Sequence, residues 1–169
     1  MASITALLHT ENDALRLGRA LETLYACDDI LIVDHSSRDG TMRIAREYGA
    51  RVVAARQGAS PEDYLRISAL NSRSPDSRWI LCLDPRESLT EKLAASLFEW
   101  KSESFHTHPP EALAFSVFLR EETAQGWLQI PTPQTRLVPQ TWNVWNGRVP
   151  MHAASALALE GELLRFVFP

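Results

Sequence analysis

The amino-acid sequence predicts an α/β fold with a mostly parallel central sheet flanked by helices and a β-rich C-terminal part. Three observations predict this fold. Short apolar runs near residues 4–8, 30–33 and 79–83 have the length and composition of strands that are covered on both faces. Around these runs, apolar residues recur at intervals of three and four, as they do along one face of a helix. Beyond residue 102 the helical pattern stops and short strand-like runs replace it.

The first half begins with a strand at Ile4–Leu8 and a helix that Thr10 can cap, with Asp13 near the positive end of the helix dipole. The apolar face of this helix comprises Ala14, Leu17, Leu21, Leu24 and Tyr25.

A second strand, Ile30–Val33, leads through a polar loop into a helix over Gly40–Tyr48, which Gly49 ends. A third strand, Arg51–Ala54, completes a βαβαβ pattern, which predicts a parallel sheet with right-handed crossovers.

The next helix is expected from Ser60 to Leu70, because a capping serine, a proline and two acids stand at its start. After a polar turn at Asn71–Ser77 come the strand Trp79–Leu83 and a helix to Lys101. Residues Ser88–Glu91 have the spacing of a capping box at the start of that helix. Beyond the polar connector 102–111, strands are predicted at Leu113–Leu119, Thr135–Val138, Val144–Val149 and Leu157–Phe168.

Composition limits the class of protein. The chain has 169 residues, 45% of them hydrophobic and 22% charged, with a net charge of −4. A mildly acidic chain is a poor candidate for nucleic-acid binding, which needs a basic face. No apolar run is long enough for a membrane span, and no signal peptide is apparent, so we expect a cytoplasmic location. Cys27 and Cys82 are expected to be buried thiols rather than a disulfide.

Two acids, Asp34 and Asp84, each follow a predicted buried strand. In open parallel sheets the ligand crevice lies outside the carboxyl ends of the strands, so both carboxylates can reach one crevice. One would accept hydrogen bonds from a base or ribose, and the other would reach a metal on the phosphates. The alternative is that each acid only caps the turn that follows its strand.

Three stretches, Thr10–Asn12, Ile32–Thr41 and Ile80–Glu87, together resemble the nucleotide-sugar half of family 2 glycosyltransferases with the GT-A fold, especially the lipopolysaccharide-core type. The resemblance covers about the first 100 residues, and Asp39-Gly40-Thr41 is its most specific part. It implies one domain, with residues 1–101 binding the nucleotide sugar and residues 102–169 forming a shortened acceptor half. It also implies that a sugar moves from a nucleotide-diphosphate donor, a UDP-sugar, to a hydroxyl acceptor.

The resemblance assigns roles to several residues. Thr10 and Glu11 would line the uridine or ribose pocket, and Asp34 would hydrogen-bond the base or ribose. Asp39 corresponds to a second acid of the loop, but it precedes a glycine and a helix, so holding the helix is an equal alternative. Arg66 would face the diphosphate; the alternative is a solvated helix charge.

The metal-binding motif departs from the family. Relatives have Asp-Ala-Asp-Glu where this chain has Asp84-Pro85-Arg86-Glu87. A divalent cation, Mn²⁺ or Mg²⁺, needs hard oxygen ligands, and a guanidinium repels it. Asp84 and Glu87 would still hold the cation if Arg86 turned away. Alternatively, Arg86 would neutralise the diphosphate itself, or donor binding has been lost.

The general base also departs from the family, whose members carry Val-His-Glu near the end of the domain. The matching stretch here ends in His152-Ala153, so the histidine is kept and the acid is lost. Glu121 and Glu122 are the candidate substitutes; their alternative role is that of exposed surface acids. Trp127, Trp142 and Trp145 would stack on an acceptor sugar or pack in the core. His106 and His108 have a spacing seen in metal sites but no third ligand near in sequence.

Two functions therefore remain open. The first is a glycosyltransferase. The second is a non-catalytic, degenerate glycosyltransferase-like binding or assembly module, which Arg86 and Ala153 favour. If the chain is a glycosyltransferase, its acceptor half is short. A homo-oligomer or a partner chain is one way to complete the acceptor site.

Overall fold

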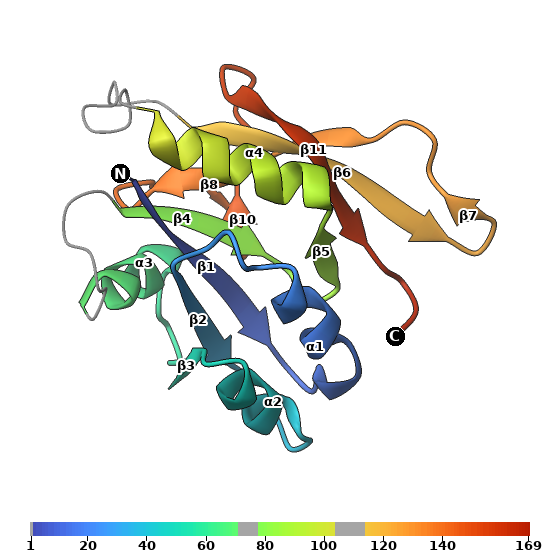
Figure 1. Cartoon of the computed structure of the whole chain (residues 1–169). Coiled ribbons are helices and arrows are strands. Elements are labelled where there is room, and N and C mark those ends of the chain that lie inside the picture. Colours follow the sequence, from blue (N-terminus) through green and yellow to red (C-terminus); the bar gives the residue numbers. More distant parts are fainter. Residues whose placement is uncertain (1, 71–77, 104–113) are drawn as a thin grey trace.

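The computed structural model describes residues 2–70, 78–103 and 114–169 of the chain. Its first four strands are β1 (Ser3–Thr10), β2 (Asp29–Asp34), β3 (Arg51–Ala54) and β4 (Arg78–Leu83). They lie in the order β3-β2-β1-β4, and each pairs with its neighbour in parallel (Figure 1). The parallel βα arrangement predicted for the first half is therefore confirmed.

The second half of the chain extends the same sheet. Strand β8 (Thr132–Pro139) pairs antiparallel with β4, and β6 (Phe115–Thr123) follows it. Strand β11 (Leu157–Arg165) runs parallel to β6, and β5 (Glu87–Leu89) closes the far edge. The sheet is thus mixed, and β5, which comes directly after β4 in sequence, lies beyond strands of the second half. Two short hairpins complete the described structure. Strand β7 (Gly126–Trp127) pairs with β6, and β9 (Trp145–Asn146) pairs separately with β10 (Val149–Pro150).

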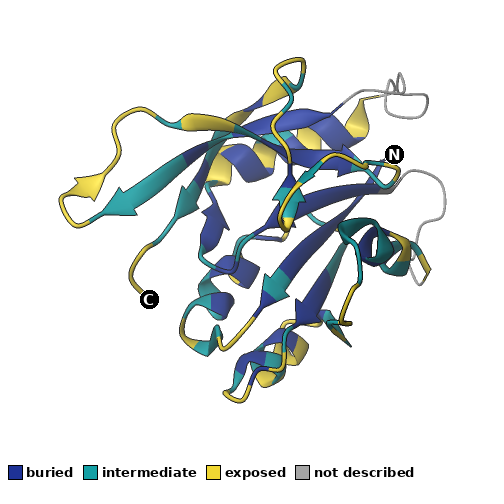
Figure 2. Cartoon of the chain, turned by 180° about the vertical axis from the view of Figure 1, so that it is seen from behind, coloured by how far each residue is buried: buried dark blue, intermediate teal, exposed yellow. Residues whose placement is uncertain are grey.

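The helices cover both faces of the sheet. Residues of α1 (Ala14–Glu22), α2 (Thr41–Glu47) and α4 (Glu91–Ser102) belong to one core cluster with alternate residues of β1 and β4. Helix α3 (Pro61–Leu70) contributes Tyr64 and Leu65 to a second cluster on the opposite face, with Leu7, Val33 and Ile80. Figure 2 shows the central strands buried and the tip of the β6–β7 hairpin exposed.

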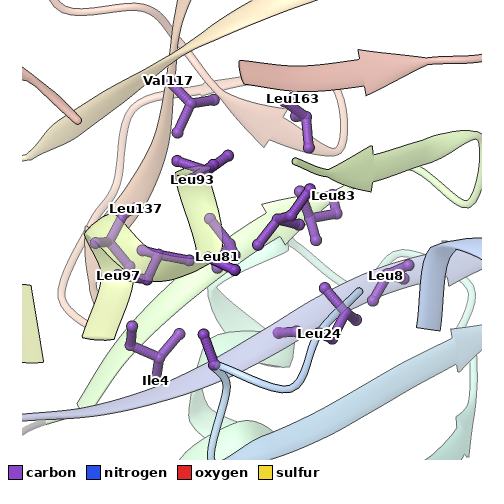
Figure 3. Packing of buried hydrophobic residues seen from close by; sticks show 14 of the residues in the cluster. Ile4, Leu8, Leu24, Leu81, Leu83, Leu93, Leu97, Val117, Leu137 and Leu163 are labelled. Atoms are coloured by element: carbon purple, nitrogen blue, oxygen red, sulfur yellow. The ribbon is translucent and has the colours of Figure 1, made fainter. Parts of the chain in front are cut away.

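The larger cluster joins the two halves of the chain. Leu93 and Leu97 of α4 lie between Leu81 of β4 and Val117 and Leu137 of the second half (Figure 3). Beside them, the rings of Trp79, Trp100 and Phe115 pack edge to face, with centroids 5.1–5.6 Å apart. Such aromatic contacts stabilise beyond the area that they bury.

Several predicted boundaries are wrong. Thr10 does not cap the first helix; it lies in β1, and α1 begins at Ala14. The capping box at Ser88 is also absent, because Ser88 lies in β5 and Thr90 caps α4 by accepting the amide of Leu93 at 3.3 Å.

In the second half, the strand predicted at Val144–Val149 is instead the β9–β10 hairpin, which turns at Gly147, where φ is +63°. Strand β11 ends at Arg165 rather than Phe168. The predicted turn at 71–77, most of the connector 102–111 and the pair His106 and His108 lie outside the described residues.

Within the described ranges, no helix is long and apolar enough to cross a membrane. Cys27 and Cys82 are both free and belong to different core clusters, as expected for thiols rather than a disulfide. Burial raises the pKa of each thiol to about 12.

Candidate functional site

The candidate site lies at the carboxyl edge of the parallel strands. Strand β1 lies between β2 and β4, with Thr10 opposite Asp34 and Leu8 opposite Leu83. Asp34 and Asp84, at the ends of β2 and β4, are therefore on one edge of the sheet, as predicted. In open α/β sheets this edge is where ligands bind.

Asp34 holds the loop that follows β2. Its Oδ1 accepts hydrogen bonds from the hydroxyls of Thr10 at 2.7 Å and Ser37 at 2.6 Å, and its Oδ2 accepts the amide of Ser37 at 2.9 Å. Burial alone would raise the pKa of Asp34, but these hydrogen bonds outweigh it, and the pKa lies below its ordinary value. The carboxylate is therefore ionised at neutral pH, and Oδ2 accepts one hydrogen bond where a carboxylate oxygen can accept two.

The loops after β1 and β2 are joined by hydrogen bonds. The amide of Asn12 donates to Ser37, and the amide of Arg38 donates back to Asn12. Asp39 accepts the amides of Thr41 at 3.0 Å and Ala14 at 3.1 Å, so one carboxylate holds the first residues of both α1 and α2. These bonds agree with the predicted alternative in which Asp39 holds the helix.

Arg86 is bound to its own neighbour, Asp84. Its Nε and Nη2 donate to the two carboxylate oxygens at 2.8 Å and 3.1 Å, and its amide donates to Oδ1 at 2.9 Å. Burial raises the pKa of Asp84, but the hydrogen bonds and charge of Arg86 outweigh it, so the pKa of Asp84 is lowered. The negative charge of the Asp84 carboxylate is thus compensated by an arginine in the same turn.

Glu87 is part of a buried ion cluster. Its side chain is 0% exposed, and that of Arg136 from β8 is 1% exposed. The carboxylate accepts bonds from Arg136 at 2.8 and 3.0 Å and from Arg165 of β11 at 2.7 and 3.0 Å. The amide of Asp84 donates to it as well, at 2.9 Å. With five donors, both oxygens of this carboxylate are fully hydrogen-bonded.

The predicted divalent cation does not fit this arrangement. Glu87 is directed into the arginine cluster, Asp84 is bound by Arg86, and both oxygens of each are already hydrogen-bonded. No group of three or more metal-binding side chains occurs within the described parts of the chain. The surroundings of Glu87 therefore support a structural role in place of the predicted metal ligation.

The predicted catalytic residues have different hydrogen-bond partners. Glu121 accepts a bond from Arg165 at 2.6 Å, and Glu122 accepts the amides of Val167 and Phe168 at 3.1 and 3.4 Å. His152 is exposed, and its Nδ1 lies 3.0 Å from the hydroxyl of Thr135. Because Leu137 of β8 is opposite Leu81 of β4, Thr135 and His152 lie near the carboxyl end of β4.

The remaining predicted residues lie on the surface or pack against the core. Glu11 is exposed, with its amide bound to Asp13, and Arg66 is 73% exposed and pairs with Asp63 at 3.1 Å. Trp142 and Trp145 pack against the second core cluster. Trp127 packs edge to face on Phe166 with centroids 5.1 Å apart. The arrangement of these tryptophans favours packing over an acceptor platform.

One cluster of side chains at the carboxyl edge of the parallel strands was not predicted. Nδ1 of His9 lies 2.9 Å from Nε2 of His35, and Nη2 of Arg148, at the turn of the β9–β10 hairpin, lies 3.4 Å from Nδ1 of His35. Burial, together with His35 and Arg148, lowers the pKa of His9 to about 4. The three residues are 26 and 113 positions apart in sequence, so no local motif could have indicated them.

The chain is thus an α/β protein with polar side chains at the carboxyl edge of its parallel strands, and it has relatives among known proteins. It is 34% identical over 132 residues to a TPR repeat-containing protein from Synechococcus elongatus, covering 78% of this chain and 30% of that protein. It is also 30% identical over 97 residues to an uncharacterized glycosyltransferase from Rickettsia felis, covering 55% of this chain and 32% of that one. No family model matches.

The relative from Rickettsia felis confirms, at the level of the family, the resemblance to glycosyltransferases that the sequence predicts. The chain spans about a third of the length of these two relatives, 30% and 32%. Among solved structures, it resembles glucosyl-3-phosphoglycerate synthase from Mycobacterium tuberculosis in complex with Mn²⁺, UDP and glucosyl-3-phosphoglycerate. The TM-score is 0.46 and the identity 18%, covering 73% of this chain and 46% of that one.

Proposed function

We propose that this chain forms one GT-A-like domain of a glycosyltransferase that transfers a sugar from a nucleotide-diphosphate donor, a UDP-sugar, to a hydroxyl acceptor. The observation that carries the proposal is the buried, ionised Asp34 at the end of β2, whose Oδ2 accepts the Ser37 amide and can accept a second donor. A carboxylate placed in this way suits the N–H of a base or the hydroxyls of a ribose. The family of the curated relatives supports the same class of reaction.

Donor binding can be tested by thermal unfolding. Titration with UDP, UDP-sugars and GDP-sugars, with and without manganese, should raise the melting temperature by about 5–10 °C at a hundredfold excess over Kd. Asp34→Ala should abolish the shift, whereas Glu47→Ala, which removes an exposed acid of α2, should keep it. A wild-type protein that no nucleotide stabilises would rule out the transferase and leave the binding site unassigned.

A second candidate function is a non-catalytic binding or assembly module. The observation that favours it is that Glu121 and Glu122 are both bound to the C-terminal segment, while alanine stands at 153. Donor hydrolysis and sugar transfer separate the two functions. If His152 acts as the general base, His152→Ala should abolish transfer and leave nucleotide binding unchanged. Nucleotide binding without any release of sugar or UDP would support the module.

A further inference from the structure

Arg148, His35 and His9 form a chain of hydrogen bonds whose direction can be assigned. A guanidinium can only donate, so Nδ1 of His35 must accept from Arg148 across 3.4 Å. The proton of the neutral His35 ring is then on Nε2, which donates to Nδ1 of His9 across 2.9 Å. Arg148 is therefore held by a long contact to a neutral ring. No carboxylate within the described ranges lies at ion-pair distance from it.

Arg86 and Arg148 differ in what an incoming anion must displace. Arg86 has two charge-assisted bonds to Asp84, and a phosphate would have to break them and expose the aspartate. Arg148 would give up only its contact to His35. A phosphate oxygen would also meet His35, which can become a second donor by taking up a proton. Arg148 is therefore the better anion receptor of the two.

We infer that Arg148 and His35 together bind a phosphate of the nucleotide donor, in place of a divalent cation. This inference rests on the proposed function, since it assumes that a nucleotide binds at the carboxyl edge. Arg148 supplies a permanent charge from the β9–β10 hairpin, and His35 supplies a charge that forms when the phosphate arrives. The hairpin thereby links the nucleotide loop after β2 to the second half of the chain.

Binding should then take up a proton. The groups that face His35 are His9, Arg148, Glu11 and Asp34. In the free protein, burial and Arg148 lower the pKa of His35, while Glu11 and Asp34 oppose that shift. A bound phosphate adds a negative charge beside the ring and raises this pKa. Because the bound state holds more protons than the free state, affinity should increase as the pH falls from about 8 to 6.

The test is calorimetric titration of the whole chain with UDP, uridine and a UDP-sugar. Arg148→Gln should weaken UDP about ten- to a hundredfold, which is the range for losing a hydrogen bond to a charged group. Uridine, which has no phosphate, should bind the variant and the wild type equally. Arg43→Gln removes an exposed arginine of α2 that pairs with Glu47 and serves as the matched control, with no change expected.

The pH dependence uses the UDP-sugar, because its diphosphate does not titrate in this range. Wild-type affinity should rise from pH 8 to pH 6, and His35→Gln should remove that slope. Affinity should be the same in EDTA as in manganese. A requirement for manganese, an equal loss of uridine and UDP in Arg148→Gln, or a larger loss in Arg86→Gln would each overturn the inference. If the wild type binds no nucleotide, the proposed function itself fails.

Discussion

Among single residues, Asp34 shapes the loop after β2, and we propose that it also accepts a hydrogen bond from a ligand. Its three hydrogen bonds come from Thr10 and Ser37, and both partners are buried. A carboxylate with these partners orders the loop before any nucleotide arrives. The loop is therefore preorganised, which reduces the entropy that binding must overcome.

Asp34→Asn should lower the free energy of unfolding by about 1–3 kcal/mol at pH 7, because the amide nitrogen cannot accept the Ser37 amide. The pKa of Asp34 is lower in the folded chain than in the unfolded one. Its ionised form therefore stabilises the fold above the unfolded pKa, and this contribution is lost as the pH falls through the folded pKa. Urea titrations should show the variant and the wild type converging below about pH 4. A gap that stays constant down to pH 3 would contradict this account.

The sequence predicted the position of Asp34 and offered the helix-holding role of Asp39 as one of two alternatives, since both follow from a strand, a short loop and a helix start. It did not predict what surrounds Glu87. The partners Arg136 and Arg165 are 49 and 78 residues away and enter through strands of the second half. An acid in a metal-like motif and an acid in a buried ion cluster cannot be distinguished from local sequence, because the difference lies in long-range pairing.

At the scale of elements, α4 lies against β11 at a bulge. The register of β11 against β6 shifts between Ala158 and Glu162. Thr90, the cap of α4, exchanges hydrogen bonds with Glu162 at 2.9–3.1 Å. At the bulge, Gly161 has φ +93°, and the start of α4 passes directly over its Cα. The close approach requires glycine at this position.

Gly161→Ala should therefore be strongly destabilising. An added Cβ would lie 2.3 Å from the amide nitrogen of Leu93 and 2.6 Å from its Cα, and neither backbone atom can move without shifting α4. The expected loss is about 2–5 kcal/mol, from left-handed backbone strain and overpacking together. Gly58→Ala is the matched control, because φ there is +75° and nothing lies within 4 Å. Urea unfolding of this control should show a free energy of unfolding lowered by about 1–2 kcal/mol, from backbone strain alone.

The sequence predicted the βα elements of the first half well, since each has a continuous apolar run or a helical spacing. The shortest strands, in both halves, were predicted less accurately for a physical reason. Strand β5 has only three residues and β9 and β10 two each, too few for a periodic pattern. Their places depend on Glu87, Trp145 and other contacts that join distant parts of the chain.

At the scale of the whole molecule, the buried ion cluster joins the two halves. Glu87 belongs to β5 in the first half, whereas Arg136 and Arg165 belong to β8 and β11 in the second. Breaking a buried ion pair by removing one partner leaves an uncompensated charge, which costs about 3–5 kcal/mol. Glu87→Gln should therefore destabilise the chain by about that amount, as a single transition in urea, because both halves share one sheet.

The control is Lys92→Gln, which breaks the pair with Glu160, whose side chains are 72% and 80% exposed. Exposed pairs contribute about 0–1 kcal/mol, so this variant should unfold almost like the wild type.

The Glu87→Gln variant also tests whether Glu87 binds a metal ion. If Glu87 holds a cation, Glu87→Gln would lose a manganese-induced rise in melting temperature and keep the stability of the metal-free chain. If Glu87 joins the halves, the metal-free chain itself is destabilised, because the charge of Arg136 is then buried without a counter-charge.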